Sequence, residues 1–77
     1  MQRYYFDLHN GKALTQDRKG IELDGLERVR KRALSLLSLL ERDDQPENDQ
    51  ATYEVRVRDG SEKMILKATL ALKVERL

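Results

Sequence analysis

Apolar residues recur at three- and four-residue steps across residues 24–40, which is the spacing of an amphipathic helix. They are Leu26, Val29, Ala33, Leu36, Leu37 and Leu40. Asp24 stands where an N-cap is expected, and Glu27 three residues later completes a capping box. Leu34 lies at the edge of this stripe, whereas Leu39 lies nearly opposite it. Leu39 is therefore interpreted either as one exposed apolar residue or as a contact with a second subunit.

Alternating apolar and polar residues predict two strands before the helix, at residues 3–10 and about 13–16. Tyr4, Phe6 and Leu8 share the face expected to meet the core. Asn10-Gly11 is a hairpin signal. A three-residue loop is favoured because it pairs Leu8 with Leu14 and keeps Leu14 on the core face.

The second half of the chain predicts two more strands, at residues 52–59 and 63–72, with Asp59-Gly60 at the turn. The expected core face holds Tyr53, Val55, Val57, Met64, Leu66, Ala68, Leu70 and Leu72. Residues 41–51 are polar, acidic and without periodicity, so they are expected to form a mobile loop. The predicted fold is one α+β domain over residues 1–77 in the order ββαββ. One amphipathic helix packs on one face of an antiparallel four-stranded sheet.

Composition narrows the classes of function. The 77 residues include no cysteine, which excludes disulfides and thiolate metal sites. Charged residues make up 38% of the chain, yet the formal net charge is only +1, so charge balance alone does not indicate a nucleic-acid partner. No stretch is apolar enough to span a membrane, and the N-terminus lacks the pattern of a secretion signal. The expected location is the cytoplasm.

Residues with catalytic or metal-binding chemistry are few. His9 is the only histidine, and Asp7 lies two residues before it on the same strand face. One histidine without a candidate nucleophile predicts that the protein is not an enzyme. The acidic segment offers four oxygen ligands but lacks the spacing and the glycine of a calcium loop, so no metal site is expected. Those four residues are Asp43, Asp44, Asn48 and Asp49. No glycine-rich phosphate motif is present, and neither a cofactor nor a small-molecule ligand is predicted.

Basic residues gather on the last predicted hairpin and form a candidate surface for an anion or nucleic acid. Its members are Arg3, Tyr5, Arg56, Arg58, Lys63 and Lys67. Two registers of the hairpin keep its apolar faces aligned, with Lys63 opposite either Arg56 or Arg58. Both registers place like charges across the strands, which an anionic partner would relieve. Tyr5 would add a stacking surface beside these charges.

A second candidate surface is apolar. The last predicted strand is long for so small a domain, so its end is expected either to protrude beyond its partner strand or to turn into a helix. Ile65 and Ala71 are expected to point outward from it. Together with Leu39, these residues favour a non-enzymatic protein-interaction module that self-associates as a homodimer. The alternative hypothesis is a nucleic-acid-binding module that uses the basic outer face of the sheet.

One stretch resembles a known family. Residues 3–11 read Arg-Tyr-Tyr-Phe-Asp-Leu-His-Asn-Gly, and residues 17–23 read Asp-Arg-Lys-Gly-Ile-Glu-Leu. Both segments, and Val57-Arg58-Asp59 later in the chain, resemble a family of short bacterial proteins of unknown function. Asn10 stands where that family often has aspartate, and its usual Leu-Pro-Phe ending is absent here. The resemblance implies a small α+β fold and no catalytic residue.

Overall fold

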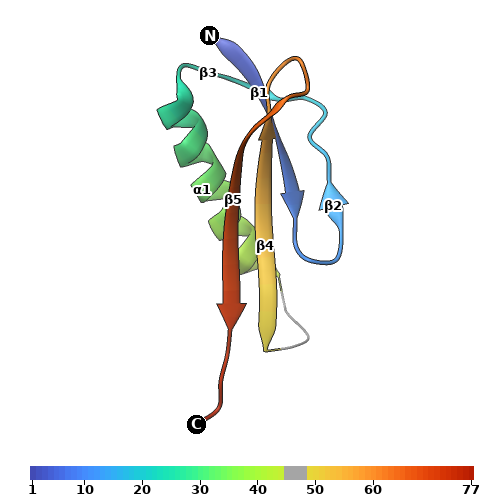
Figure 1. Ribbon diagram of the computed structural model, residues 1–77, viewed down its shortest axis with the longest axis vertical. Coiled ribbons are helices and arrows are strands. Elements are labelled where there is room, and N and C mark those ends of the chain that lie inside the picture. The colour runs from blue at the N-terminus through green and yellow to red at the C-terminus, as the bar shows by residue number, and fades with distance from the viewer. Residues whose placement is uncertain (45–48) are drawn as a thin grey trace.

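The computed structural model describes residues 1–44 and 49–77. Its elements are β1 (Gln2–His9), β2 (Leu14–Thr15), β3 (Ile21–Leu23), α1 (Leu26–Asp43), β4 (Gln50–Arg58) and β5 (Met64–Lys73) (Figure 1). The α+β class and the antiparallel sheet with one helix are therefore confirmed. The ten-residue length of β5 also agrees with the long final strand expected from the alternation.

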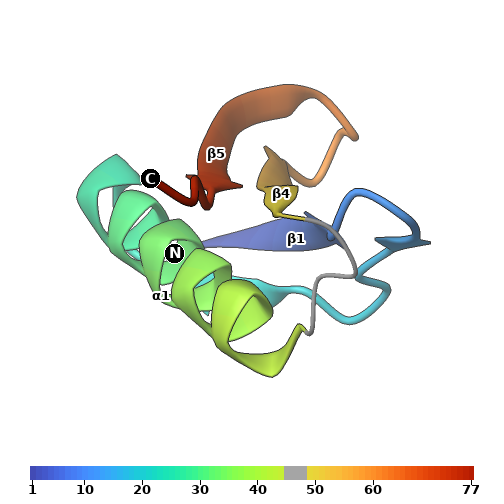
Figure 2. The ribbon, with the colours of Figure 1, turned by 90° about the horizontal axis from the view of Figure 1, so that it is seen from below.

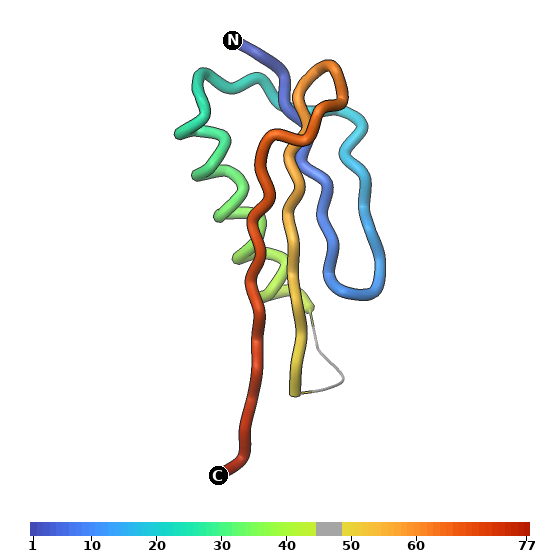
Figure 3. The backbone as a smooth tube through the Cα atoms, viewed as in Figure 1, coloured from blue at the N-terminus to red at the C-terminus, as the bar shows by residue number. Residues whose placement is uncertain are grey.

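The strand order is β2-β1-β4-β5, and β3 also pairs with β1. Every pairing is antiparallel. β2 lies beside the C-terminal end of β1, whereas β3 lies beside its N-terminal end (Figure 3). Residues 16–20 therefore leave the sheet and return to the same edge of β1. β3 is a fifth strand that the predicted four-stranded sheet did not include.

α1 lies against one face of the sheet, as the view along the strands shows (Figure 2). The buried apolar core comprises Tyr4, Phe6, Val29, Ala33, Leu37, Tyr53, Val55 and Val57. These positions follow the predicted periods of the helix and of two strands. Leu26 belongs to the predicted stripe but is exposed, so burial of α1 begins one turn later, at Val29.

The ends of α1 differ from the predicted ones. Gly25 is the N-cap, with a φ of 93°, and among the described residues no side chain caps the helix, so the capping box expected from Asp24 is not formed. The helix also continues past residue 40 to Asp43, where the amide of Asp44 donates to the carbonyl of Leu40 (3.1 Å). The loop predicted for 41–51 is consequently shorter on both sides, because β4 begins at Gln50. Residues 45–48 lie outside the described part of the chain.

The β1–β2 hairpin has a longer connection than predicted. Leu8 pairs with Thr15 and His9 pairs with Leu14, which leaves residues 10–13 in the turn. The physical reason is the Asn10 side chain, whose Oδ1 accepts from the amides of Lys12 (3.0 Å) and Ala13 (2.9 Å). The prediction that Leu14 pairs with Leu8 in the core is therefore wrong, and Leu14 is exposed.

The β4–β5 hairpin adopts neither predicted register. Arg56 lies opposite Lys67, and Val57 lies opposite Leu66. A β-bulge then shifts the pairing, so that Arg58 lies opposite Met64. The bulge gives Ile65 no opposite residue, and its half-buried side chain packs against the core instead of pointing outward as predicted.

Candidate functional site

The outer face of the sheet, opposite α1, carries a buried ion pair. Asp7 on β1 is only 8% exposed. Arg58 on β4 donates from Nε to Asp7 Oδ2 (2.8 Å) and from Nη2 to Asp7 Oδ1 (3.0 Å). The same Nη2 donates to the carbonyl of Asp17 (2.8 Å). A planar guanidinium suits this paired contact, because its N–H groups match the two carboxylate oxygens.

Asp17 attaches the excursion of residues 16–20 to β1. Its Oδ2 accepts from the amide of Phe6 (3.0 Å), and its Oδ1 accepts from the amides of Lys19 (3.1 Å) and Gly20 (3.0 Å). The amide of Asp17 in turn donates to Asp7 Oδ1 (2.9 Å). The side chain thus satisfies a strand amide at the place where β2 has ended and β3 has not yet begun.

The two carboxyl groups of this cluster are held ionised. Burial raises the pKa of Asp7, but the Arg58 guanidinium and the Asp17 amide more than offset it, so the net pKa of Asp7 is lowered. Burial likewise raises the pKa of Asp17, and the amides of Phe6, Gly20 and Lys19 outweigh it to leave that pKa lowered. The hydrogen bond to Asp7 raises the pKa of Arg58. These shifts are those of a structural network whose ionised groups are already bound by partners within the chain.

Gly20 completes the attachment. It has a φ of 71°, and a Cβ added there would come within 2.9 Å of both Arg3 Cγ and Tyr5 Cε2. The Arg58 guanidinium lies 5.0 Å from the centroid of the Tyr5 ring. The segments that carried the family resemblance therefore meet here, since residues 17–20 and Arg58 bind one another and β1.

The cations predicted to bind nucleic acid are largely engaged within the chain. Arg58 is paired with Asp7, and Arg56 Nε contacts Glu54 Oε1 (2.6 Å). Arg3 donates to the carbonyl of Lys19 (2.7 Å) and contacts Glu22 (3.5 Å). These contacts lower the positive charge that the outer face offers to a partner.

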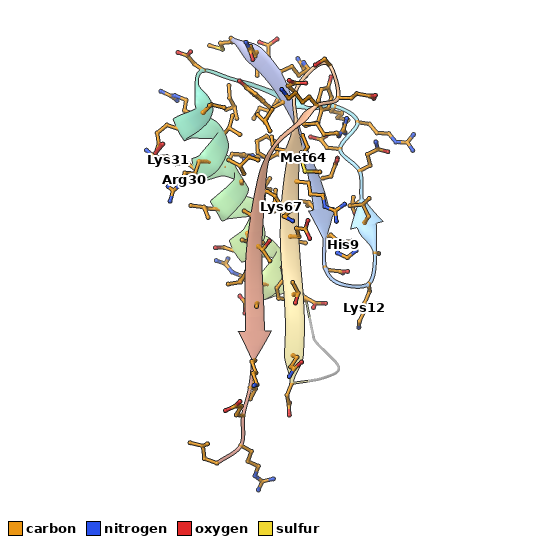
Figure 4. The ribbon with its side chains drawn as sticks, viewed as in Figure 1. His9, Lys12, Arg30, Lys31, Met64 and Lys67 are labelled. Carbon is orange, nitrogen blue, oxygen red and sulfur yellow. The ribbon has the colours of Figure 1, made fainter. Side chains whose placement is uncertain are left out.

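Three of the candidate cations are exposed: Arg3, which makes the contacts just described, and Lys63 and Lys67. Lys67 lies opposite Arg56 on the outer face (Figure 4). Lys63 is exposed in the β4–β5 turn, where its amide donates to Asp59 Oδ1 (3.0 Å). Nucleic-acid binding stays a prediction. Charge reversal at Arg58 would not test it cleanly, because that change would also break the ion pair with Asp7.

The Asp7–His9 pair expected from the strand pattern is not formed. Asp7 is bound by Arg58 and Asp17, whereas His9 Nδ1 accepts from the amide of Gly11 (3.2 Å) in the hairpin turn. Within residues 1–44 and 49–77, no group of three or more histidine or acidic residues is placed to hold a metal ion. Asn48, one of the four oxygen ligands considered, lies outside the described residues, and Asp44 Oδ2 accepts from the Tyr53 hydroxyl (2.9 Å).

The three residues predicted for self-association occupy three different places. Ala71 is exposed on the outer face of β5. Ile65 packs against the core beside the bulge. Leu39 is 44% exposed at the edge of a cavity between α1 and the β1–β2 hairpin. The structure therefore does not bring them together. Ile65 and Ala71 both belong to the edge strand β5, but Ile65 packs against the core whereas Ala71 is exposed on the outer face.

Sequence reasoning did not identify Asp17 as a central residue. The available signal was the Asp-x-x-Gly spacing of Asp17 and Gly20, which is typical of a side chain that accepts from amides two and three residues later. The pairing of Asp7 with Arg58 had no comparable local signal, since 51 residues separate them.

Residues 3–71 match the model of a family described as a domain of unknown function (DUF6894), and the chain belongs to this family. A search of the curated proteins and of the solved structures finds no significant match. Among the described residues, no helix is both long and apolar enough to cross a membrane.

Proposed function

We propose that this member of the DUF6894 family is a non-enzymatic interaction module that forms a homodimer through the outer edge of β5. One observation carries the proposal. β5 is a ten-residue strand at the edge of the sheet, and no described strand pairs with its outer side. A long edge with unpaired backbone groups favours pairing with another strand, and a two-fold arrangement satisfies both copies at once.

The backbone hydrogen bonds indicate which residues face this outer edge. The amide of Val74 donates to the carbonyl of Asp49 (2.7 Å), in line with the β4–β5 pairing. Backbone groups alternate in direction along a strand, so the residues at even positions of β5 bond to β4. Lys67, Thr69 and Ala71 therefore direct their N–H and C=O groups toward the outer edge.

Charge favours one register for a two-fold antiparallel pair. If Thr69 lies on the axis, Lys67 faces the partner's Ala71, and about six backbone hydrogen bonds form. If the axis moves one residue further along the chain, Lys67 faces the partner's Lys73, and the like charges repel. The register centred on Thr69 also lets the two hydroxyl side chains of that residue meet.

The register centred on Thr69 also places the axis at the middle of the part of β5 that is free to pair regularly. Leu66 and Leu72 lie equally far from Thr69, and the bulge at Ile65 ends regular pairing just before Leu66. On the helix side of the sheet, Leu66 would face the partner's Leu72. Leu70, which is 38% exposed, would gain apolar contacts. Pairing thus covers apolar surface as well as backbone groups.

The test is sedimentation equilibrium of the full chain and of two variants at Thr69. Thr69→Pro removes an amide hydrogen that faces the outer edge and leaves the bonds to β4 in place. Thr69→Val is the matched control, because it keeps that amide and suits a strand. We expect the full chain and Thr69→Val to dimerise with rising concentration, and Thr69→Pro to sediment as a monomer with an unchanged circular dichroism spectrum.

Cysteine cross-linking provides a second measurement, because the chain contains no cysteine. Under mild oxidation, Thr69→Cys should form a disulfide-linked dimer. Lys73→Cys should stay unlinked, because in this register it lies four residues from the axis and far from the partner's residue 73. A monomeric full chain at all concentrations would overturn the proposal. Efficient linking at Lys73→Cys with none at Thr69→Cys would overturn the register.

A further inference from the structure

A cavity of about 510 Å³ lies on the helix side of the sheet, between α1 and the segment that joins β2 to β3. Its floor is apolar and consists of Phe6, Leu8, Ile21 and Leu36. Phe6 is buried, and the other three are half-buried. The volume falls within the range of about 300–1,000 Å³ that is usual for small-molecule sites.

The cavity follows from the excursion of residues 16–20. This segment leaves the sheet edge, and the hydrogen bonds of Asp17 hold it in place against β1. α1 packs mainly on β4, β5 and β1, so the face beside the excursion is left open. The wall opposite the helix is consequently anchored backbone, which favours a site that exists before a ligand arrives.

Three cations stand at this cavity: Arg18 and Lys19 from the excursion and Arg32 from α1. All three residues are exposed, and within residues 1–44 and 49–77 none of their side chains forms an ion pair. Asp17 also lines the cavity, but its carboxylate already accepts three amide hydrogen bonds. The charge available to a ligand is therefore positive.

A second cavity of about 330 Å³ shares Leu8 and Leu36 with the first. It continues the apolar surface along Leu39 and Leu40, and then reaches Asp43 and Asp44. The combined groove is therefore cationic at one end, apolar in the middle and acidic at the other end. Leu39, which did not fit the helical stripe, forms part of its apolar wall.

We propose that this groove binds a small amphiphile with one carboxylate and an aliphatic chain. Arg18, Lys19 and Arg32 contact the carboxylate, and the chain lies over Leu8 and Leu36 toward Leu39. Arginine is suited to the head group because it contacts both carboxylate oxygens. The acidic far end disfavours a second carboxylate, so the site selects a monoacid over a diacid of equal length.

The probe is decanoate, used below its micelle concentration and followed by nuclear magnetic resonance of labelled full-length chain. We expect saturable binding, with shifts at the amides of Lys19, Gly20 and Leu36. Decanol and the ten-carbon diacid sebacate should each bind about tenfold more weakly, because one lacks the charge and the other brings a second charge to the acidic end. Equal binding of all three compounds, or no saturation with decanoate, would overturn the proposal.

Variants then test each end of the groove. Arg32→Gln should weaken decanoate binding about tenfold, whereas Lys31→Gln should leave it unchanged. Arg30 and Lys31 are matched controls because they project from the side of α1 away from β1 (Figure 4). Leu39→Ser should weaken decanoate binding and leave hexanoate binding unchanged, because only the longer chain reaches that residue. If Arg32→Gln and Lys31→Gln changed the affinity for decanoate equally, Arg32 would not contact the carboxylate as proposed.

This inference is independent of dimerisation. The titration is repeated with Thr69→Pro, in which the β5 edge is blocked. Unchanged decanoate binding in that variant is the expected result. Loss of binding there would mean that the groove as described within one chain is not the site.

Discussion

Arg58 and Asp7 form a two-point ion pair that joins β4 to β1 on the sheet face opposite the helix, with atom separations of 2.8 and 3.0 Å. Their side chains are 15% and 11% exposed. Because Arg58 also donates to the carbonyl of Asp17, the pair connects the sheet to the excursion that walls the groove. A substitution at the ion pair should therefore affect both stability and the shape of that wall.

The first prediction concerns the stability of this pair. Asp7→Asn should lower the free energy of unfolding by about 2–3 kcal/mol, because it leaves the buried Arg58 charge without a counter-charge. Arg58→Lys should also destabilise, since an ammonium cannot make the paired contact. Urea unfolding measures both changes.

Glu54→Gln is the matched control for that prediction. The Glu54 side chain is 16% exposed, but the side chain of its partner Arg56 is 38% exposed. Water therefore still solvates the charge that this substitution leaves behind, and the loss should be below about 1 kcal/mol. If Asp7→Asn were no more costly than Glu54→Gln, the ion pair on the outer face would not be a stabilising element.

The second prediction is a pH dependence. The pKa of Asp7 is lowered in the fold, so its contribution to stability is complete above the unfolded value of about 3.9 and is lost as pH falls through the lower folded value. The difference in unfolding free energy between the original chain and Asp7→Asn should therefore narrow as pH falls below about 4. Denaturant titrations at a series of pH values test this. A constant difference down to pH 2 would contradict it.

The local pattern of apolar and polar residues was sufficient to predict the fold, because the buried residues recur with the periods of a helix and of a strand. Tyr4 and Phe6 on β1, Val55 on β4 and Val29 on α1 each occupy the side that alternation or helical spacing assigns to the core. The same periods place Asp7 on the polar side of β1, but they do not indicate that Arg58 covers and buries it there. Burial of a charge depends on a partner distant in sequence, which periodicity does not report.

The strand registers and the groove could not be predicted from the alternation of apolar and polar residues, for a related reason. Asn10 lengthens the first turn through its own side-chain hydrogen bonds, and the bulge at Ile65 shifts the last hairpin. Both features change which residues lie opposite one another without changing the alternation. Arg18 and Arg32 line the same cavity only because the excursion between β2 and β3 forms the wall that faces α1. The spacing of residues within a single helix or strand does not indicate that residues from two separate segments will line one cavity.

The third prediction concerns the excursion itself. Gly20→Ala should destabilise the fold by more than about 2 kcal/mol, because Gly20 has a φ of 71° and its added Cβ would come within 3.0 Å of the Tyr4 carbonyl. Two other glycines separate these causes. Gly25→Ala, with a φ of 93° and no atom of the described residues within 4 Å of the added Cβ, should cost about 1 kcal/mol. Gly60→Ala, with neither strain nor contact, should cost little. Equal effects at all three positions would contradict the close approach at Gly20.

The last prediction tests the contact between β4 and the end of α1. The Tyr53 hydroxyl donates to Asp44 Oδ2 (2.9 Å), and the buried ring of Tyr53 lies in the core. Tyr53→Phe keeps the ring and removes this bond, so the free energy of unfolding should fall by about 1–2 kcal/mol at neutral pH.

Burial, followed by the hydrogen bond to Asp44, raises the pKa of Tyr53. Its neutral form therefore adds stability that is complete below about pH 10 and lost as pH rises through the folded value. Unfolding curves between pH 8 and about 11.5 should show the difference between the original chain and Tyr53→Phe narrowing with rising pH. A difference that widens over that range would mean that the ionised tyrosine, not the neutral one, is favoured by the fold.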